Sequence, residues 1–418
     1  MPDQKCAFCN RPANEVKTLI GEGSGPFICN RCVEASVKAL GYDSKPQGGV
    51  KKDKPLLRPK GIKAFLDDYV IGQESTKVDI AVAVYNHYKR REAIRKGMDF
   101  GGVEIKKSNI LMMGPSGSGK TECARAIVKM LDVPFYVCDA TKMTQAGYVG
   151  DDVESMLQGL LGDSGGDLER AEWGIIFIDE VDKLARKSGR NASGYRDVTG
   201  EGVQQALLKI LEGSRVTVPR GMTRLISSAG QDCDMVDTSN ILFICAGSFA
   251  GIEEVVKKRV NKSARMGFGA TARKDMDEGE VYSAVEEEDV LEFGLIPELM
   301  GRLPILTSTM PLTEDELVQI LTVPKNALVK QFKALFAMDG IDLQFDEEAL
   351  RAIGQEAKKR PTGARALRSI MENLLKPYAF EYPGDNEIKA IRISKEVVEG
   401  EAEATIVRET PEKAAQQA

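Results

Sequence analysis

Residues 108–121 read SNILMMGPSGSGKT, an apolar run followed at once by a glycine-rich turn. The turn fits the pattern G-x-x-x-x-G-K-[ST], and residues 122–131 after it have the composition of a helix. In such a strand–turn–helix, backbone N–H groups and the positive helix end point at phosphates, the lysine reaches the outer phosphates, and the hydroxyl holds Mg²⁺. The pattern therefore predicts a site for a nucleoside triphosphate and Mg²⁺ on eight residues: Gly114, Pro115, Ser116, Gly117, Ser118, Gly119, Lys120 and Thr121. A glycine-rich turn with a chance lysine is the alternative, which the flanking strand and helix disfavour.

A second apolar run, residues 174–178, ends in two carboxylates, Asp179 and Glu180. Such a run suits a strand that is buried on both faces of a parallel sheet, and these strands bring their last residues to the edge where ligands bind. We expect Asp179 to support Mg²⁺ and Glu180 to polarise the attacking water. A strand that ends in two acids by chance is common, so this interpretation depends on the glycine-rich turn upstream.

Short apolar segments alternate with helical patterns between residues 61 and 311. The strand candidates are Ile110–Met113, Phe135–Cys138, Ile175–Ile178 and Ile241–Cys245. Alternation of this kind predicts a three-layer α/β domain with a parallel sheet for residues 61–311.

The sequence pattern changes after residue 311 and becomes mainly that of helices. Thr313 and Glu316 form a capping-box pattern, and a helix-period pattern continues through Phe336. We expect residues 312–402 to form a smaller, mostly helical domain and residues 403–418 to be a polar tail.

Half of the eight cysteines lie near the N-terminus as two C-x-x-C pairs. Without secretory features, paired C-x-x-C motifs form a four-thiolate Zn²⁺ site more often than disulfides. The four expected ligands are Cys6, Cys9, Cys29 and Cys32. We expect them to define a structural zinc module at residues 1–42. This module is too small to form a hydrophobic core, so metal binding would supply its folding energy. Residues 43–60 have the composition of a linker. The remaining cysteines are best interpreted as small core residues: Cys123, Cys138, Cys233 and Cys245.

Composition excludes several classes of protein. The chain has 418 residues and a formal net charge of −6. This acidic balance argues against non-specific nucleic-acid binding, which needs a dense basic surface. The N-terminal residues lack the apolar core of a secretory signal, and no run approaches the roughly eighteen apolar residues that span a membrane. We therefore expect a cytoplasmic protein with no membrane partner.

The chain also lacks the patterns of common peptidases. His87 is its only histidine, and neither H-E-x-x-H nor G-x-S-x-G is present. A lone histidine without catalytic partners is expected to be structural, so the chain is not expected to be a peptidase itself.

Further motifs occur in a fixed order along the chain. They are Asp67–Gln73 (DDYVIGQ), Ala146–Gly150 (AGYVG), Ile178–Lys183 (IDEVDK), Gly294–Glu298 (GLIPE), Gly301–Pro304 (GRLP) and Thr362–Arg365 (TGAR). With the cysteine pairs and the glycine-rich turn, this order resembles the ClpX family of AAA+ protein unfoldases over almost the whole chain. The combination of the zinc knuckle with AAA+ motifs is specific to that family. The resemblance implies an AAA+ fold and a homohexameric ring that uses ATP to unfold proteins. It also implies three kinds of partner: a ClpP-type peptidase, substrate proteins and adaptors.

The resemblance assigns roles to residues that would look ordinary alone. Val70 and Ile71 would pack on the adenine, although a helix-entry turn is the alternative for this segment. Arg302 looks like the arginine finger that reaches a neighbouring subunit's nucleotide, and Arg365 looks like the sensor-2 arginine that follows nucleotide state. Without the family pattern, each arginine would be read as a solvated or capping charge. Ser248 is a weaker candidate for the sensor of the γ-phosphate.

Tyr148 and Val149 lie between glycines in the motif at residues 146–150. An aromatic ring on a glycine hinge can grip an extended polypeptide through van der Waals contact. In the similar family this segment is the pore loop that pulls substrate through the ring. The alternative is a tyrosine that packs on its own domain in a tight turn.

Two segments depart from the family pattern. Residues 218–225 lack the basic Arg-Lys-His cluster that selects substrate tags, so the preferred tag is open. The peptidase-docking loop commonly carries Ile-Gly-Phe, and this chain has Met266, Gly267 and Phe268. Methionine is an acceptable flexible apolar side chain for such a contact.

Two other functions stay open at this point. The altered docking tripeptide leaves room for an AAA+ remodeller that works without a peptidase. A nucleic-acid-dependent ATPase that uses the zinc module as a reader is a further alternative, which the acidic charge and the few basic residues of the module disfavour.

Overall fold

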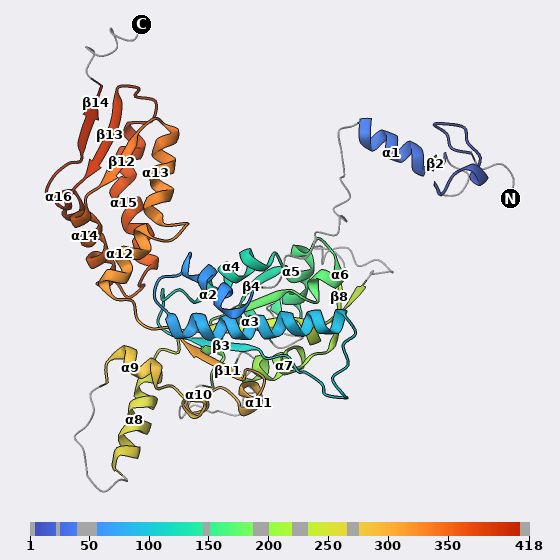
Figure 1. The fold of residues 1–418 in the computed structure, drawn as a ribbon, viewed down its shortest axis with the longest axis horizontal. Helices are drawn as coiled ribbons and strands as arrows, with labels where there is room; N and C mark the ends of the chain where they lie inside the picture. The colour runs from blue at the N-terminus through green and yellow to red at the C-terminus, as the bar shows by residue number, and fades with distance from the viewer. Residues whose placement is uncertain are drawn as a thin grey trace. The chain divides into compact units, whose positions relative to one another are not determined.

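The computed structural model describes residues 5–21, 26–39, 57–144, 151–186, 200–219, 233–265 and 276–409. The chain divides into two compact units, Met1–Pro55 and Leu56–Ala418 (Figure 1). Among the described residues, no helix has the length and apolar character needed to cross a membrane.

The first unit is built around the two cysteine pairs. Its elements are η1 (Ala13–Glu15), the antiparallel strands β1 (Leu19–Ile20) and β2 (Ile28–Cys29), and α1 (Asn30–Ala39). Cys29 ends β2 and Cys32 lies in the first turn of α1, so the second pair occupies a strand–helix junction.

A five-stranded parallel sheet forms the centre of the second unit, with the strand order β11-β3-β10-β7-β4. The strands are β3 (Ile110–Met113), β4 (Phe135–Asp139), β7 (Ile175–Asp179), β10 (Leu242–Gly247) and β11 (Ile305–Ser308). The predicted α/β fold with a parallel sheet is confirmed, and the four expected strands are present. β11 was not expected, because it is a short edge strand and most of its side chains are only half-buried.

Helices cover both faces of this sheet. Successive strand residues point to opposite sides, and in β3 all four are apolar and buried, so both faces need a cover. Ile110 and Met112 share one core with α2, α3 and α4, whereas Leu111 and Met113 share the other core with α5 to α11. The helices of the first face are α2 (Pro59–Asp67), α3 (Glu74–Arg95) and α4 (Lys120–Leu131). Those of the second face are α5 (Ser155–Asp163), α6 (Leu168–Ala171), α7 (Glu201–Glu212), α8 (Ile252–Arg265), α9 (Glu278–Ser283), α10 (Glu287–Phe293) and α11 (Pro297–Met300). This arrangement is the expected three-layer domain.

Short elements connect the main ones. They are η2 (Ala140–Lys142), the paired strands β5 (Met143–Thr144) and β6 (Asp151–Asp152), η3 (Val181–Leu184), the antiparallel strands β8 (Arg215–Pro219) and β9 (Cys233–Asp237), and η4 (Thr238–Asn240).

The C-terminal part has its own core, formed by helices and a three-stranded sheet. The helices are α12 (Glu314–Thr322), α13 (Leu328–Met338), α14 (Glu347–Lys358), α15 (Arg365–Glu381) and α16 (Lys395–Glu399), and the strands are β12 (Asp342–Phe345), β13 (Ile388–Ile393) and β14 (Thr405–Arg408). The capping box of Thr313 and Glu316 is confirmed at the start of α12.

This part corrects one expectation from the sequence. Residues 405–408, which we assigned to a polar tail, form β14 and pair with β13. Ile406 and Val407 are half-buried in that pairing, whereas the charged residues around them dominate the composition of the segment.

Candidate active site

The glycine-rich turn joins β3 to α4, as the sequence predicts. Three of its glycines have positive φ angles, +138° at Gly114, +75° at Gly117 and +101° at Gly119, which residues with a Cβ rarely adopt. A Cβ on Gly114 would also collide with Thr309, whose hydroxyl binds the Met113 carbonyl at 3.0 Å. Glycine is therefore required here by both conformation and space.

Lys120 begins α4 and is only 9% exposed. Its Nζ donates to the carbonyl oxygens of Gly114 at 2.6 Å and Pro115 at 2.9 Å, so the ammonium lies inside the turn. Burial lowers the pKa of Lys120; with the opposing charge of Asp179 and the smaller contribution of Arg365, which adds to the lowering, the pKa comes to about 8. A phosphate placed in this turn would therefore meet a buried cation that two carbonyl oxygens hold in position.

Asp179 and Glu180 stand at the end of β7, on the same edge of the sheet as the glycine-rich turn. β10 separates β7 from β3, and all three strands are parallel, so their carboxyl ends lie together. Glu180 adopts a left-handed conformation with φ +58°, and its N–H donates to Asp179 Oδ1 at 3.0 Å. The Glu180 side chain is exposed, which leaves its carboxylate accessible to water.

Asp182 is a buried carboxylate beside this pair that the sequence analysis did not single out. It accepts hydrogen bonds from Ser248 N at 3.1 Å and Ser248 Oγ at 3.2 Å, and it pairs with Lys183 at 2.8 Å. Ser248, the weaker sensor candidate, is thus held to the segment that follows β7. The only available signal was a second aspartate within the IDEVDK motif.

Val70 lies in the turn between α2 and α3 and is 5% exposed. Its Cγ1 lies 3.8 Å from the position that a Cβ on Gly119 would take, so this segment borders the glycine-rich turn. Ile71, the next residue, is half-buried. Lys77 fixes the turn, since its Nζ reaches Asp67 at 2.5 Å and the Val70 carbonyl at 3.4 Å.

The same turn is tied to the segment that leads into the C-terminal part. Gln73, with φ +58°, donates from Nε2 to Met310 O at 2.9 Å and accepts from Met310 N at 2.7 Å. Asp68 pairs with Lys325 at 2.6 Å. The sequence motif contained Gln73 but offered no reason to give it a role, because its partner lies 237 positions away.

Arg365 reaches the glycine-rich turn from the start of α15. Its Nη1 donates to Ser116 Oγ at 3.5 Å. A Cβ on Gly363 would lie 2.8 Å from the Ser116 carbonyl oxygen, and one on Gly117 would collide with the Thr362 carbonyl. The turn before α15 therefore packs directly on the glycine-rich turn.

Arg302 is not part of this cluster. It follows α11, is about half-exposed, and pairs with Glu212 at the end of α7. The structure thus brings together the glycine-rich turn, Asp179, Val70 and Arg365, and it places Arg302 elsewhere on the surface of the subunit.

Two predicted functional segments lie outside the described residues. They are Tyr148 with Val149, and Met266 with Gly267 and Phe268. The paired strands β5 and β6 flank the first of these segments.

His87, the single histidine, is 4% exposed and packs against Tyr88 and Trp173 with ring centroids 5.0 Å and 6.2 Å away. Burial, together with the charge of Arg90, lowers the pKa of His87 to about 3. The imidazole is therefore neutral near pH 7 and lies within the packed core.

The four N-terminal cysteines converge in the first unit. Their Sγ atoms all lie within 4.8 Å of one another, and those of Cys9 and Cys29 are 3.6 Å apart. A tetrahedral Zn²⁺ with Zn–S bonds of about 2.3 Å separates its sulfurs by about 3.8 Å, so the thiols need only small shifts to bind the ion. Burial raises the pKa of the Cys6 thiol, but surrounding backbone N–H groups, including Cys29 N at 3.2 Å, outweigh it and lower the pKa to about 6. The set fits a closed structural zinc site.

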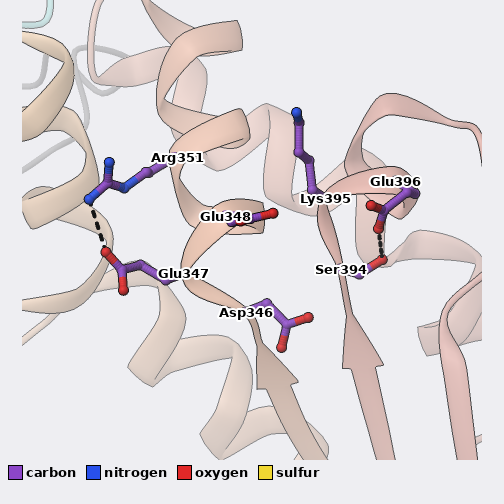
Figure 2. A pocket seen from close by; sticks show the side chains of 7 residues that line it. All are labelled: Asp346, Glu347, Glu348, Arg351, Ser394, Lys395 and Glu396. Atoms are coloured by element: carbon purple, nitrogen blue, oxygen red, sulfur yellow. Dashed lines mark hydrogen bonds and ion pairs between the residues drawn. The ribbon is translucent and has the colours of Figure 1, made fainter.

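A separate hollow lies on the C-terminal part, between the starts of α14 and α16 (Figure 2). Its lining residues are Asp346, Glu347, Glu348, Arg351, Ser394, Lys395 and Glu396. Arg351 pairs with Glu347 at 3.0 Å, and the Ser394 hydroxyl donates to Glu396 at 2.6 Å. None of the residues predicted for nucleotide binding lines this hollow.

Comparison with known protein families gives three matches along the chain. Residues 105–306 match the AAA domain (Cdc48 subfamily), residues 4–40 match the ClpX C4-type zinc finger, and residues 312–395 match the C-terminal, D2-small domain of ClpB protein. The chain is also 45% identical to the ATP-dependent Clp protease ATP-binding subunit ClpX of Treponema denticola, over 398 residues that cover 94% of this chain and 93% of that protein. The resemblance found in the sequence is confirmed, and the chain belongs to the ClpX family of AAA proteins.

Proposed function

We propose that this chain is an ATP-dependent protein unfoldase that threads substrates through a homohexameric ring into a ClpP-type peptidase. The observation that carries the proposal is the convergence of the glycine-rich turn, the acidic end of β7 and Arg365 at one edge of the parallel sheet. Membership of the ClpX family supports the ATP-dependent activity.

ATP hydrolysis is assigned to residues at that edge. Lys120 and the turn amides hold the phosphates, and Thr121 with Asp179 supports Mg²⁺. Glu180, whose carboxylate faces water, orients and activates the attacking water. ATP and Mg²⁺ supply the transferable phosphoryl group and the charge neutralisation that this chemistry needs.

The adenine is assigned to Val70 and Ile71, which border the glycine-rich turn. Arg365 binds the outer phosphates from the C-terminal part, so that nucleotide state controls the position of that part. The hydrogen bonds of Gln73 to Met310 extend the same coupling to the connecting segment. Binding and domain movement therefore share one set of contacts.

Arg302 is assigned to the nucleotide of the neighbouring subunit. Its guanidinium is about half-exposed, and it does not join the cluster around Lys120 in its own chain. An arginine supplied in trans stabilises the charge that develops during phosphoryl transfer, and it requires a ring or another head-to-tail assembly.

Mechanical work and peptidase docking are assigned from the sequence. Tyr148 and Val149 would grip the substrate in the pore, and Met266, Gly267 and Phe268 would dock on the peptidase. The zinc module would receive substrates and adaptors. We assign the chain to the cytoplasm. Its four clustered thiols are arranged to bind a metal rather than to form disulfides, which agrees with a reducing compartment.

The test is degradation of a folded, tagged reporter with ATP, with and without a ClpP-type peptidase. We expect reporter loss only when both ATP and peptidase are present. A remodeller without a peptidase would unfold the reporter in the absence of peptidase and would not accelerate its degradation when peptidase is added. A nucleic-acid-dependent ATPase would instead show turnover that rises with nucleic acid and not with unfolded protein.

A further inference from the structure

We infer that Asn109 is a positioning residue for Arg302, and that its side-chain amide holds the backbone from which the proposed arginine finger extends. This inference rests on the trans role proposed for Arg302. Asn109 immediately precedes β3 and is 2% exposed.

The amide of Asn109 is fully engaged by three backbone groups. Nδ2 donates to the carbonyl oxygen of Arg302 at 2.9 Å and to that of Leu211 at 3.3 Å, while Oδ1 accepts from Phe243 N at 3.3 Å. One side chain therefore joins the beginning of β3 to β10, to the end of α7 and to the segment after α11.

The backbone of Arg302 depends on this contact. Its N–H donates to Leu299 O at 2.9 Å in the turn that closes α11, and its carbonyl receives Asn109 Nδ2. Pairing with β3 begins only at Ile305, whose N–H reaches Asn109 O at 3.4 Å, and Pro304 has no N–H to offer. The Asn109 side chain thus ties the backbone of Arg302 to the sheet, although Arg302 precedes the first residue that pairs with β3.

The guanidinium also has a partner beside this contact. The Arg302 side chain pairs with Glu212. The carbonyl of Leu211, the residue before Glu212, accepts from the same Asn109 Nδ2 that binds the Arg302 carbonyl. Leu303 is buried at 1% exposure, whereas the Arg302 side chain is about half-exposed. A rigid backbone with an exposed charged end suits a group that acts outside its own subunit.

Asparagine is the side chain that this position needs. Aspartate has nearly the same shape but would place a carboxylate oxygen against two carbonyl oxygens, and alanine would remove the side-chain partner of three backbone groups, two of them in buried contacts. Displacement of a catalytic group by about 1 Å can lower turnover about a hundredfold. Because the finger acts in the transition state, the loss should appear in kcat and not in nucleotide affinity.

The test measures ATPase activity of Asn109→Ala alone and in rings mixed with Glu180→Gln. An Asn109→Ala subunit has an intact nucleotide site and a displaced finger, whereas Glu180→Gln has the reverse. In an equal mixture, about a quarter of the interfaces join an intact site to an intact finger, so activity should rise to about a quarter of the wild-type rate. A gain of activity in the mixture also shows that the Asn109→Ala subunit is folded. If that variant does not fold, Asn109→Ser takes its place in the same experiment.

Arg302→Ala mixed with Glu180→Gln is the parallel experiment. If that mixture gains activity and the Asn109 mixture does not, the inference is wrong while the trans role of Arg302 stands. If neither mixture gains activity, the trans role itself is wrong, and the inference is overturned with it.

Thr307→Val is the matched control for stability. It removes a hydrogen bond of another buried residue, from Thr307 Oγ1 in β11 to Asp79 at 2.7 Å, without touching Arg302. Its kcat should stay near that of wild type. An equal fall in kcat for Thr307→Val and Asn109→Ala would show that loosening of the sheet, and not the position of Arg302, causes the defect.

Discussion

Raising the pH from 7 to 9 should weaken ATP binding through one group, Lys120. Its ammonium is 9% exposed, and burial lowers its pKa to about 8. With that pKa, about nine tenths of the free protein carries the charge at pH 7 and about one tenth at pH 9. A bound phosphate restores the charged form, so the affinity for ATP should fall about tenfold over this range.

Proton uptake gives an independent measure of the same event. Because binding recharges Lys120, about 0.1 proton per ATP should be taken up at pH 7 and about 0.9 at pH 9. Titration calorimetry in two buffers with different ionisation heats measures this number. The experiment is done in Glu180→Gln to prevent turnover; Glu180 is not among the charges that shift this pKa.

Lys120→Met is the matched control, because its side chain has similar length and does not titrate. Its weaker affinity should be the same at both pH values, without proton uptake. If the wild-type lysine also shows a flat affinity and no uptake at pH 9, then Lys120 is fully charged in the free protein and the argument from its burial is wrong.

Four further predictions concern separate parts of the molecule. Glu180→Gln should keep ATP affinity and nearly abolish hydrolysis, whereas Lys120→Ala should weaken binding itself; equal losses of affinity would contradict the two roles. Cys29→Ser or chelation of zinc should unfold only residues 1 to about 42 and leave the ATPase of the rest intact, which circular dichroism and turnover can follow together. Gln73→Ala should destabilise the second unit by about 2–4 kcal/mol, since both Met310 groups lose their partner, and Gln73→Gly should cost about 1 kcal/mol less because it relieves the left-handed backbone. Tyr148→Ala should slow the unfolding of a stable tagged domain far more than it slows ATP hydrolysis, and a parallel fall of melting temperature, ATPase and unfolding would contradict its role as a pore residue.

The parts of this molecule that could be predicted from its sequence are those whose physics is local. The glycine-rich turn has its strand, glycines and lysine within fourteen consecutive residues, and the run before Asp179 reveals a strand buried on both faces. Because parallel strands end at one edge of a sheet, these two motifs could also be placed near each other before the structure was known.

The contacts that complete the site could not be predicted in this way. Arg365 and Ser116 are 249 positions apart, and Asn109 and Arg302 are 193 apart. Hydrophobic periodicity reports which face of an element is buried and says nothing about which distant backbone group an amide will reach. Family resemblance supplied Arg302 and Arg365, and nothing in the sequence distinguished Asn109 from any other polar residue before a strand.

The sheet of the C-terminal part shows a second limit. Residues 342–345 form β12 between two helices, with only four residues to show a period. In so short a window a helical and an extended pattern look alike. β14 could not be predicted either, because its extended conformation depends on pairing with β13.

The proposal that ATP hydrolysis drives unfolding is tested most directly by the unfolding rate of a stable, tagged reporter, measured beside ATP hydrolysis for the wild type and Glu180→Gln. We expect the wild type to unfold the reporter only with ATP and Mg²⁺, and Glu180→Gln to bind ATP and reporter but leave the reporter folded. Unfolding by Glu180→Gln at the wild-type rate would contradict the claim that hydrolysis at the end of β7 drives the work.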